Sequence, residues 1–116
     1  RSAMFGILAG TTYPFDAEEG EALFGAEFDR ANNIASGGNH GICIGTTKPW
    51  AHRLGEINLP TLVIHGTADP ILPLDHGQAL AAGIPGAKML ELEGAGHDIP
   101  DALLDTIVPA IFEHTA

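Results

Sequence analysis

Two short apolar runs in the second half of the chain predict β-strands. The first, TLVIH at residues 61–65, is rich in β-branched side chains and is bounded by proline and glycine, as buried strands often are. The second, AKMLEL at residues 87–92, alternates more. Between them, residues 74–84 carry apolar side chains at helical spacing and end in a Pro-Gly pair. The pattern predicts two parallel strands joined by a crossover helix.

Longer helical patterns flank this unit. On its N-terminal side, Asp16 precedes a pattern that extends to about Ile34, with Glu19 at the third position of a capping box. On its C-terminal side a helix is predicted from Pro100, and Pro109 inside it predicts a kink. Two adjacent apolar stripes run along this last helix, formed by Leu104, Val108 and Phe112 and by Leu103, Ile107 and Ile111.

The remaining segments give weaker signals. Residues 1–10 have the composition of a helix tail that ends at Gly10, and residues 11–15 a linker. The glycines of residues 36–39 predict a break. Residues 42–44 fit either a short helix or an extended piece, and residues 49–54 fit a short helix. The first half is therefore helical and irregular, with no alternation of strands.

Each predicted strand is followed by a loop with a candidate catalytic side chain. Asp69 comes just past the first strand, in G-T-A-D-P, and His97 just past the second, in E-G-A-G-H. Sites gather at the carboxyl ends of parallel strands, so we expect the two side chains to lie together. An imidazole can accept and return a proton near neutral pH, and a carboxylate on its other nitrogen fixes its tautomer. The pair predicts the orienting half of an acyl-transfer triad.

These motifs resemble the C-terminal part of α/β-hydrolase-fold enzymes, the superfamily of esterases, lipases and epoxide hydrolases. Strand, G-x-x-D-P, helix, strand and G-x-G-H occur in that order from Leu54 onward. In that family the chain order is nucleophile, acid, histidine, and Asp69 matches the acid and His97 the histidine. The resemblance implies an α/β fold: residues 54–116 form part of the hydrolase core, with two parallel strands, a crossover helix and a C-terminal helix, and residues 1–53 form a helical cap-like segment.

The family's nucleophile elbow, G-x-S-x-G, and its upstream oxyanion-hole segment do not occur in this sequence. Cys43, in G-I-C-I-G, is a poor substitute, because an elbow ends a buried strand and starts a helix whereas the residues before it are polar and glycine-rich. It also precedes Asp69 too closely to leave room for a helix, a strand and another helix. Ser36 is a weaker candidate still. We expect a serine outside this chain in an esterase, or an aspartate in an epoxide hydrolase or haloalkane dehalogenase.

The resemblance implies hydrolysis of an ester, or of a related acyl or lactone bond, in a small hydrophobic molecule, with no metal or organic cofactor required. The alternative is an inactive fragment or interaction module that dimerises or complements a missing N-terminal half, because absent upstream strands would leave an unpaired edge and an apolar patch. The length of 116 residues, about half of a usual family member, and the start at Arg1 agree with a fragment. Candidates for the substrate side are Met4, Phe24, Phe28 and Trp50, for which ordinary core positions are the simpler interpretation.

Other polar residues have simpler interpretations than catalysis. Asp98 adjoins His97 and competes as the acid, but we expect it to face the start of the last helix, where a carboxylate is favoured. Asp75 and His76 fit a surface helix cap, and His65 at the strand end fits a residue packed in the core or behind the site. A metal site is disfavoured because no ligand spacing occurs at the remaining histidines, His40, His52 and His114.

The charge and composition exclude several partners. A formal net charge of −10 disfavours nucleic acids and anionic membranes, which require basic patches. The single Cys43 forms no intrachain disulfide, no apolar run approaches the ~18 residues of a membrane span, and residues 1–10 do not resemble a signal peptide. We expect a soluble, cytoplasmic protein.

Overall fold

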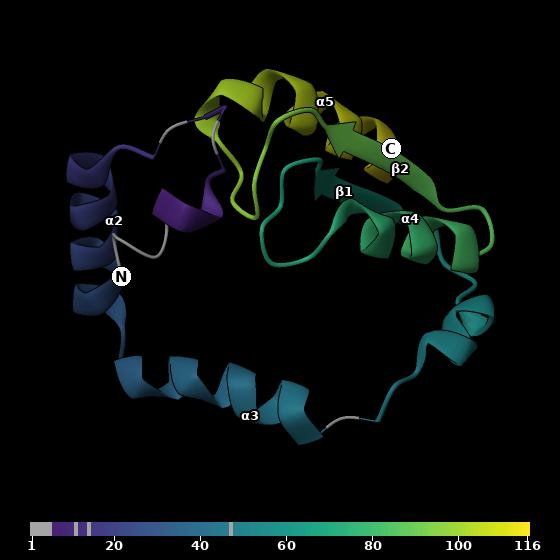
Figure 1. Cartoon of the computed structure of the whole chain (residues 1–116), viewed down its shortest axis with the longest axis horizontal. Helices are drawn as coiled ribbons and strands as arrows, with labels where there is room; N and C mark the ends of the chain where they lie inside the picture. Colours follow the sequence, from purple (N-terminus) through teal and green to yellow (C-terminus); the bar gives the residue numbers. More distant parts are fainter. Residues whose placement is uncertain (1–5, 11, 14, 47) are drawn as a thin grey trace.

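The computed structural model describes residues 6–10, 12–13, 15–46 and 48–116, apart from the side chain of Thr46. The described part contains two strands, four α-helices with defined bounds and three 3₁₀ helices (Figure 1). In chain order the elements are α2 (Ala17–Arg30), η1 (Ile34–Gly38), α3 (Asn39–Thr46), η2 (Ala51–Glu56), β1 (Leu62–Gly66), α4 (Leu74–Gly83), β2 (Lys88–Leu92), η3 (Asp101–Leu103) and α5 (Leu104–Thr115).

The strand–helix–strand unit forms as predicted. β1 pairs in parallel with β2, with Leu62 opposite Lys88 and Gly66 opposite Leu92. Each strand begins one residue later than the apolar run indicated, and α4 occupies the predicted crossover. The turn from α4 to β2 uses Gly86 at a φ of +76°, a left-handed conformation that glycine adopts without steric cost. The prediction of two parallel strands with a crossover helix is confirmed.

Helices α4 and α5 lie on opposite sides of the sheet (Figure 1). Successive side chains of a strand point to opposite faces, and β1 shows this directly. Ile64 packs against the buried core cluster of Leu92, Ala95 and Ile107, the last of which belongs to α5. The next residue, His65, lies instead against Gly77 of α4. The small core therefore lies between the sheet and α5. The other face of the sheet carries the imidazole of His65, which contacts α4.

Helix α2 begins where the capping signal placed it but ends early. The Asp16 carboxylate accepts the backbone N–H groups of Glu18 and Glu19, at 2.8 and 3.0 Å. The helix ends at Arg30 rather than near Ile34, so the predicted C-terminal boundary is wrong. The cause lies in Asn33, whose side chain accepts the N–H of Ala35 and starts a separate 3₁₀ helix, η1. Asparagine side chains commonly compete with helix hydrogen bonds in this way.

Every residue from 31 to 45 is exposed. Residues 42–44, which fitted either conformation, are helical in α3, and the break expected over 36–39 is the 3₁₀ helix η1 joined directly to α3. The short helix expected over 49–54 is the 3₁₀ helix η2. Residues 6–8 are helical and are followed by a turn at Gly10, while the prediction for residues 1–5 lies outside the described residues.

The last helix has a short 3₁₀ lead-in. Pro100 is the N-cap of η3, and α5 begins only at Leu104, so the predicted start at Pro100 is four residues early. Of the two apolar stripes, Ile107 is the position that is buried, and Phe112 is exposed. Pro109 lies within α5, and the kink it predicts stays a prediction. In the described part of the chain, no helix has the length and apolar character needed to cross a membrane.

Candidate active site

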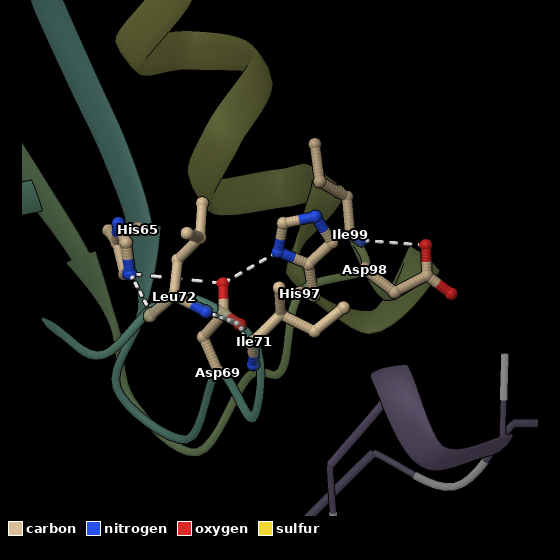
Figure 2. Close-up of polar contacts among 7 residues, drawn as sticks. All are labelled: His65, Asp69, Ile71, Leu72, His97, Asp98 and Ile99. Atoms are coloured by element: carbon tan, nitrogen blue, oxygen red, sulfur yellow. Dashed lines mark hydrogen bonds and ion pairs between the residues drawn. The ribbon is translucent and has the colours of Figure 1, made fainter. Parts of the chain in front are cut away.

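Asp69 and His97 meet at the carboxyl-terminal edge of the two strands. The Nδ1 atom of His97 lies 2.8 Å from Oδ2 of Asp69, and Figure 2 shows the imidazole edge turned toward the carboxylate. The Asp69 side chain is 5% exposed and the His97 side chain 39%. The acid is therefore enclosed, while its histidine partner reaches solvent.

The acid loop, residues 69–72, holds the Asp69 carboxylate by its backbone. Oδ1 accepts the N–H groups of Ile71 and Leu72, at 2.8 and 2.9 Å. This is the turn that an aspartate before a proline favours, because the short side chain reaches the backbone two and three residues on. Oδ1 is thus occupied within the loop, and Oδ2 is left to face His97.

The same contacts set the ionisation of Asp69. Burial raises the pKa of the carboxyl group, but hydrogen bonds from Leu72, from His97 and from Ile71, together with the charge attraction to His97, outweigh burial and lower the pKa below its ordinary value. Asp69 is therefore a carboxylate at neutral pH. Because a carboxylate only accepts hydrogen bonds, the proton between the two groups belongs to Nδ1 of His97.

The loop that carries His97 is fastened to its surroundings through the backbone. The N–H of His97 donates to the Leu8 carbonyl at 2.7 Å, and the N–H of Ala68 donates to the Ala95 carbonyl at 2.9 Å. The hydroxyl of Thr67 accepts the N–H of Gly94 at 2.8 Å. The two loops are thereby joined to each other and to the N-terminal segment, which limits how far His97 can move from Asp69.

Glycines make this close contact between loops sterically feasible. A Cβ on Gly66 would lie 2.2 Å from the carbonyl oxygen of Gly96 and 2.4 Å from that of Ala95. A Cβ on Gly96 would lie 1.9 Å from the carbonyl oxygen of Leu8. These contacts are with backbone atoms, which cannot turn aside as a flexible side chain can. The glycines of G-T-A-D-P and G-A-G-H are visible in the sequence. No feature of the sequence indicated that the backbone of Leu8 contacts the His97 loop.

The arrangement leaves one ring nitrogen of His97 available for chemistry. With Nδ1 donating to Asp69, the neutral imidazole has an unprotonated Nε2, and Figure 2 shows the far side of the ring turned away from Asp69. A base needs this lone pair, and the Asp69 carboxylate would stabilise the imidazolium that forms when the base takes a proton. The pair therefore has the orientation of a general base and its supporting acid.

His65 lies behind the Asp69 carboxylate. Its Nε2 atom is 2.8 Å from the Leu72 carbonyl oxygen and 3.8 Å from Oδ2 of Asp69, and its side chain is 10% exposed. The ring packs against α4 at Gly77, where a Cβ would come within 2.6 Å of Nδ1. The sequence predicted a packed residue at this position; its contact with the acid loop had no signal in the sequence.

The other candidates lie elsewhere. The carboxylate of Asp98 accepts the N–H of Ile99, at 3.2 Å, and Asp69 occupies the Nδ1 side of His97 instead. Cys43 is exposed within α3 rather than at a strand end, and the Ser36 hydroxyl donates to the Asn33 carbonyl in η1. Among the described residues, no group of three or more His, Cys, Asp or Glu side chains is arranged to hold a metal ion.

A cavity of about 530 Å³ lies next to the segment that follows His97. It is bounded by residues 98–102, by the N-terminal turns of α2 and by the segment before them, and its apolar lining includes Tyr13, Phe15, Leu23 and Ile99. The described residues suggested for the substrate side do not line this cavity. Trp50 and Phe28 are exposed, Phe24 is half-buried, and Met4 lies outside the described residues. The simpler prediction of core positions is wrong for Trp50 and Phe28.

Comparison with known proteins identifies the fold family of the chain. A family model described as alpha/beta hydrolase fold matches residues 13–101. Rhodomycin D methylesterase of Streptomyces peucetius is 32% identical over 118 residues, which cover 94% of this chain and 37% of that protein. A 2-hydroxy-6-oxononadienedioate/2-hydroxy-6-oxononatrienedioate hydrolase of Cupriavidus pinatubonensis is 50% identical over 48 residues, covering 41% of this chain and 17% of that protein.

Among solved structures, a bromoperoxidase from Bacillus anthracis aligns with a TM-score of 0.48 at 25% identity, covering 60% of this chain and 26% of that one. The chain spans 37% of the length of the methylesterase. The family model, in contrast, covers well over half of this chain and includes both strands, α4 and the loops of Asp69 and His97. The chain belongs to the α/β-hydrolase fold family.

Proposed function

We propose that this chain supplies the acid and the histidine of a carboxylic ester hydrolase. The observation that carries the proposal is the 2.8 Å contact between Asp69 and His97 at the carboxyl-terminal edge of parallel strands, in a chain of this family. The methylesterase of Streptomyces peucetius, matched over 94% of this chain, favours an ester among the bonds that such a pair hydrolyses.

In the proposed reaction the nucleophile is a serine from a segment of the fold that this chain does not span. The serine hydroxyl gives its proton to Nε2 of His97 as its oxygen bonds to the ester carbonyl carbon. The imidazolium, stabilised by Asp69, returns that proton to the alkoxide that leaves. Water then repeats the two steps on the acyl-enzyme and releases the acid, so no metal or organic cofactor takes part.

For the substrate we propose a small hydrophobic ester. Support comes from the cavity of about 530 Å³ beside residues 98–102, which is lined in part by Tyr13, Leu23 and Ile99. Ligand pockets of this size with mainly apolar walls and a few polar groups are typical of small-molecule sites. In this proposal residues 1–53 act as a cap-like segment over a core formed by residues 54–116, since the wall of the cavity on one side belongs to α2.

The test is covalent labelling by a fluorophosphonate, read by intact mass. The chain is prepared alone and fused behind the preceding portion of the Streptomyces peucetius methylesterase. We expect an adduct on a serine of the fused protein and none on the chain alone. In the fused protein, Asp69→Asn and His97→Ala should slow labelling and ester turnover by roughly 10³- to 10⁴-fold, while His76→Ala, an exposed histidine of α4, serves as the matched control.

Two results would overturn this proposal. One is an adduct on the chain alone, which would mean that a nucleophile such as Ser36 is active here. The other is labelling and turnover in the Asp69→Asn and His97→Ala variants at the rate of the His76→Ala control, which would remove both residues from the reaction.

An association role is a second candidate, favoured by the outer face of α5. Val108, Ile111 and Phe112 are exposed there, and exposed apolar groups of this kind mark surfaces that bind protein. We propose that they pack against the preceding portion of the hydrolase fold. Mixing the chain with that portion of the methylesterase should give a complex by light scattering, and Phe112→Ser should weaken it relative to Glu113→Ser; equal binding by both variants would exclude this surface.

A further inference from the structure

The side chain of His65 has no role in the proposed reaction, yet it is almost enclosed next to the reacting pair. Its ring is fixed on two sides. The backbone of β1 holds it in register opposite Glu91, and α4 approaches so closely at Gly77 that any side chain there would meet the ring. Figure 2 shows His65 on the side of Asp69 away from His97.

One residue, Leu72, connects His65 to the acid. Its N–H donates to Oδ1 of Asp69 at 2.9 Å, and its carbonyl oxygen lies 2.8 Å from Nε2 of His65. A carbonyl oxygen only accepts hydrogen bonds, so Nε2 of His65 carries a proton and donates it. Leu72 is therefore held at both backbone groups: its N–H by the Asp69 carboxylate and its carbonyl by the His65 imidazole.

The acid loop holds the Asp69 carboxylate in one orientation. With Oδ1 bound to the backbone of Ile71 and Leu72, the plane of the carboxylate follows the acid loop, and Oδ2 is directed at His97. The Nε2–H group of His65 is 3.8 Å from the same Oδ2, so its positive end adds a favourable electrostatic contact on the side opposite His97. We propose that His65 is a positioning residue that holds the acid loop and thereby aims the Asp69 carboxylate at His97.

The catalytic meaning of this proposal rests on the proposed function, but the positioning itself is measurable without turnover. The measurement is long-range ¹H–¹⁵N NMR of the imidazoles in this chain, together with a ¹³C titration of the Asp69 carboxyl group. The variants are His65→Leu, which removes the donor, and His65→Gln, whose amide nitrogen can occupy the position of Nε2. His76→Leu is the control, because His76 is an exposed histidine of α4 outside the acid loop, four residues after Leu72.

In the wild-type chain we expect the Nε2–H tautomer of His65 and the Nδ1–H tautomer of His97. His65→Leu should abolish the slowly exchanging Nδ1–H signal of His97 and raise the lowered pKa of Asp69 toward its ordinary value, since the hydrogen bonds that lower it become loose. His65→Gln should keep the Nδ1–H signal of His97 and the lowered pKa of Asp69. A side chain that only fills space would not have this effect. His76→Leu should leave the signal and the pKa unchanged.

The proposal is overturned if His65→Leu keeps the His97 Nδ1–H signal and the Asp69 pKa at wild-type values, or if wild-type His65 is the Nδ1–H tautomer. If His65→Leu fails to fold, His65→Asn replaces it: the asparagine amide is too short to reach the Leu72 carbonyl, so it should behave unlike His65→Gln, and identical behaviour would also overturn the proposal. Labelling of the fused Asp69→Asn and His97→Ala variants at the rate of the His76→Ala control would instead reject the proposed function and leave this positioning role intact.

Discussion

The strand–helix–strand unit and the segment of α2 and α3 place their apolar side chains differently. In the first, Ile64, Leu92 and Ala95 pack with Ile107 of α5 into the core, and glycines bring two loops into backbone contact. In the second, apolar side chains such as Leu23, Phe28 and Ile42 are exposed, and the buried position of α2 is Gly20.

The difference shows what fixes the candidate site. Asp69 and His97 follow strands that are paired and packed, and their loops are joined to each other by backbone hydrogen bonds. Helix α2 contributes a wall of the cavity, and neither α2 nor α3 adds a large apolar side chain to the buried core. We infer that the reactive geometry depends on the strand unit and that α2 influences which molecules reach it.

Truncating one leucine in each region should give very different results. Leu92 in β2 is 4% exposed and Leu23 in α2 is 61% exposed. Leu92→Ala should lower the free energy of unfolding by about 2–5 kcal/mol, because it leaves a cavity in the core, whereas Leu23→Ala should change it by no more than ~0.5 kcal/mol. Urea unfolding measures both. Equal losses would mean that α2 is packed as firmly as the strand unit.

Adding a methyl group at the crossing of the loops should damage the site and the fold together. Gly66→Ala places a Cβ against the carbonyls of Ala95 and Gly96, and overpacking of this kind typically costs about 1–3 kcal/mol. The Nδ1–H signal of His97 should be lost with it. If the variant kept wild-type stability and the Nδ1–H signal of His97, the loops would have room for a methyl group at Gly66, and the close contact would not be required.

Acid should destabilise the strand unit through Asp69. The folded-state pKa of Asp69 lies below its ordinary value, so the ionised group stabilises the fold above the unfolded-state pKa of about 3.9, and this contribution is lost as the pH falls through the lower folded-state value. Asp69→Asn should therefore be less stable than wild type at pH 7, and the gap should narrow below about pH 4. A gap that is independent of pH would contradict the charge-based account.

The smallest expected effect has the opposite sign. Gly25 lies inside α2 with open space where a Cβ would sit, so Gly25→Ala should stabilise the helix by up to ~1 kcal/mol. Hydrogen exchange of the α2 amides should slow by up to about fivefold, with no change at β1 and β2. Faster exchange in α2 would show that Gly25 is needed for a contact there.

The same division explains which features were predictable from the sequence. The β-branched run before Gly66 and the alternating run before Glu93 correctly predicted both strands, the crossover helix and the parallel pairing. The juxtaposition of Asp69 and His97 followed from the rule that strand ends share an edge. The catalytic roles of the two residues stay predictions that the labelling experiment tests.

Features decided by side-chain competition or by distant contacts were not predictable. The end of α2 depends on the Asn33 side chain capping η1, which an apolar pattern does not reveal. The start of α5 depends on a 3₁₀ turn after Pro100. The contacts of Leu8 with His97 and of His65 with Leu72 join residues that belong to different predicted segments, so only the folded chain brings them together.

The most direct test of the central claim is the ¹⁵N spectrum of the His97 imidazole in the wild-type chain. A paired acid and base predict, for the neutral ring, a protonated Nδ1 that exchanges slowly with water and an unprotonated Nε2, and Asp69→Asn should remove that preference. A neutral ring protonated at Nε2, or a spectrum unchanged by Asp69→Asn, would contradict the assignment of Asp69 and His97 as the orienting pair of a hydrolase site.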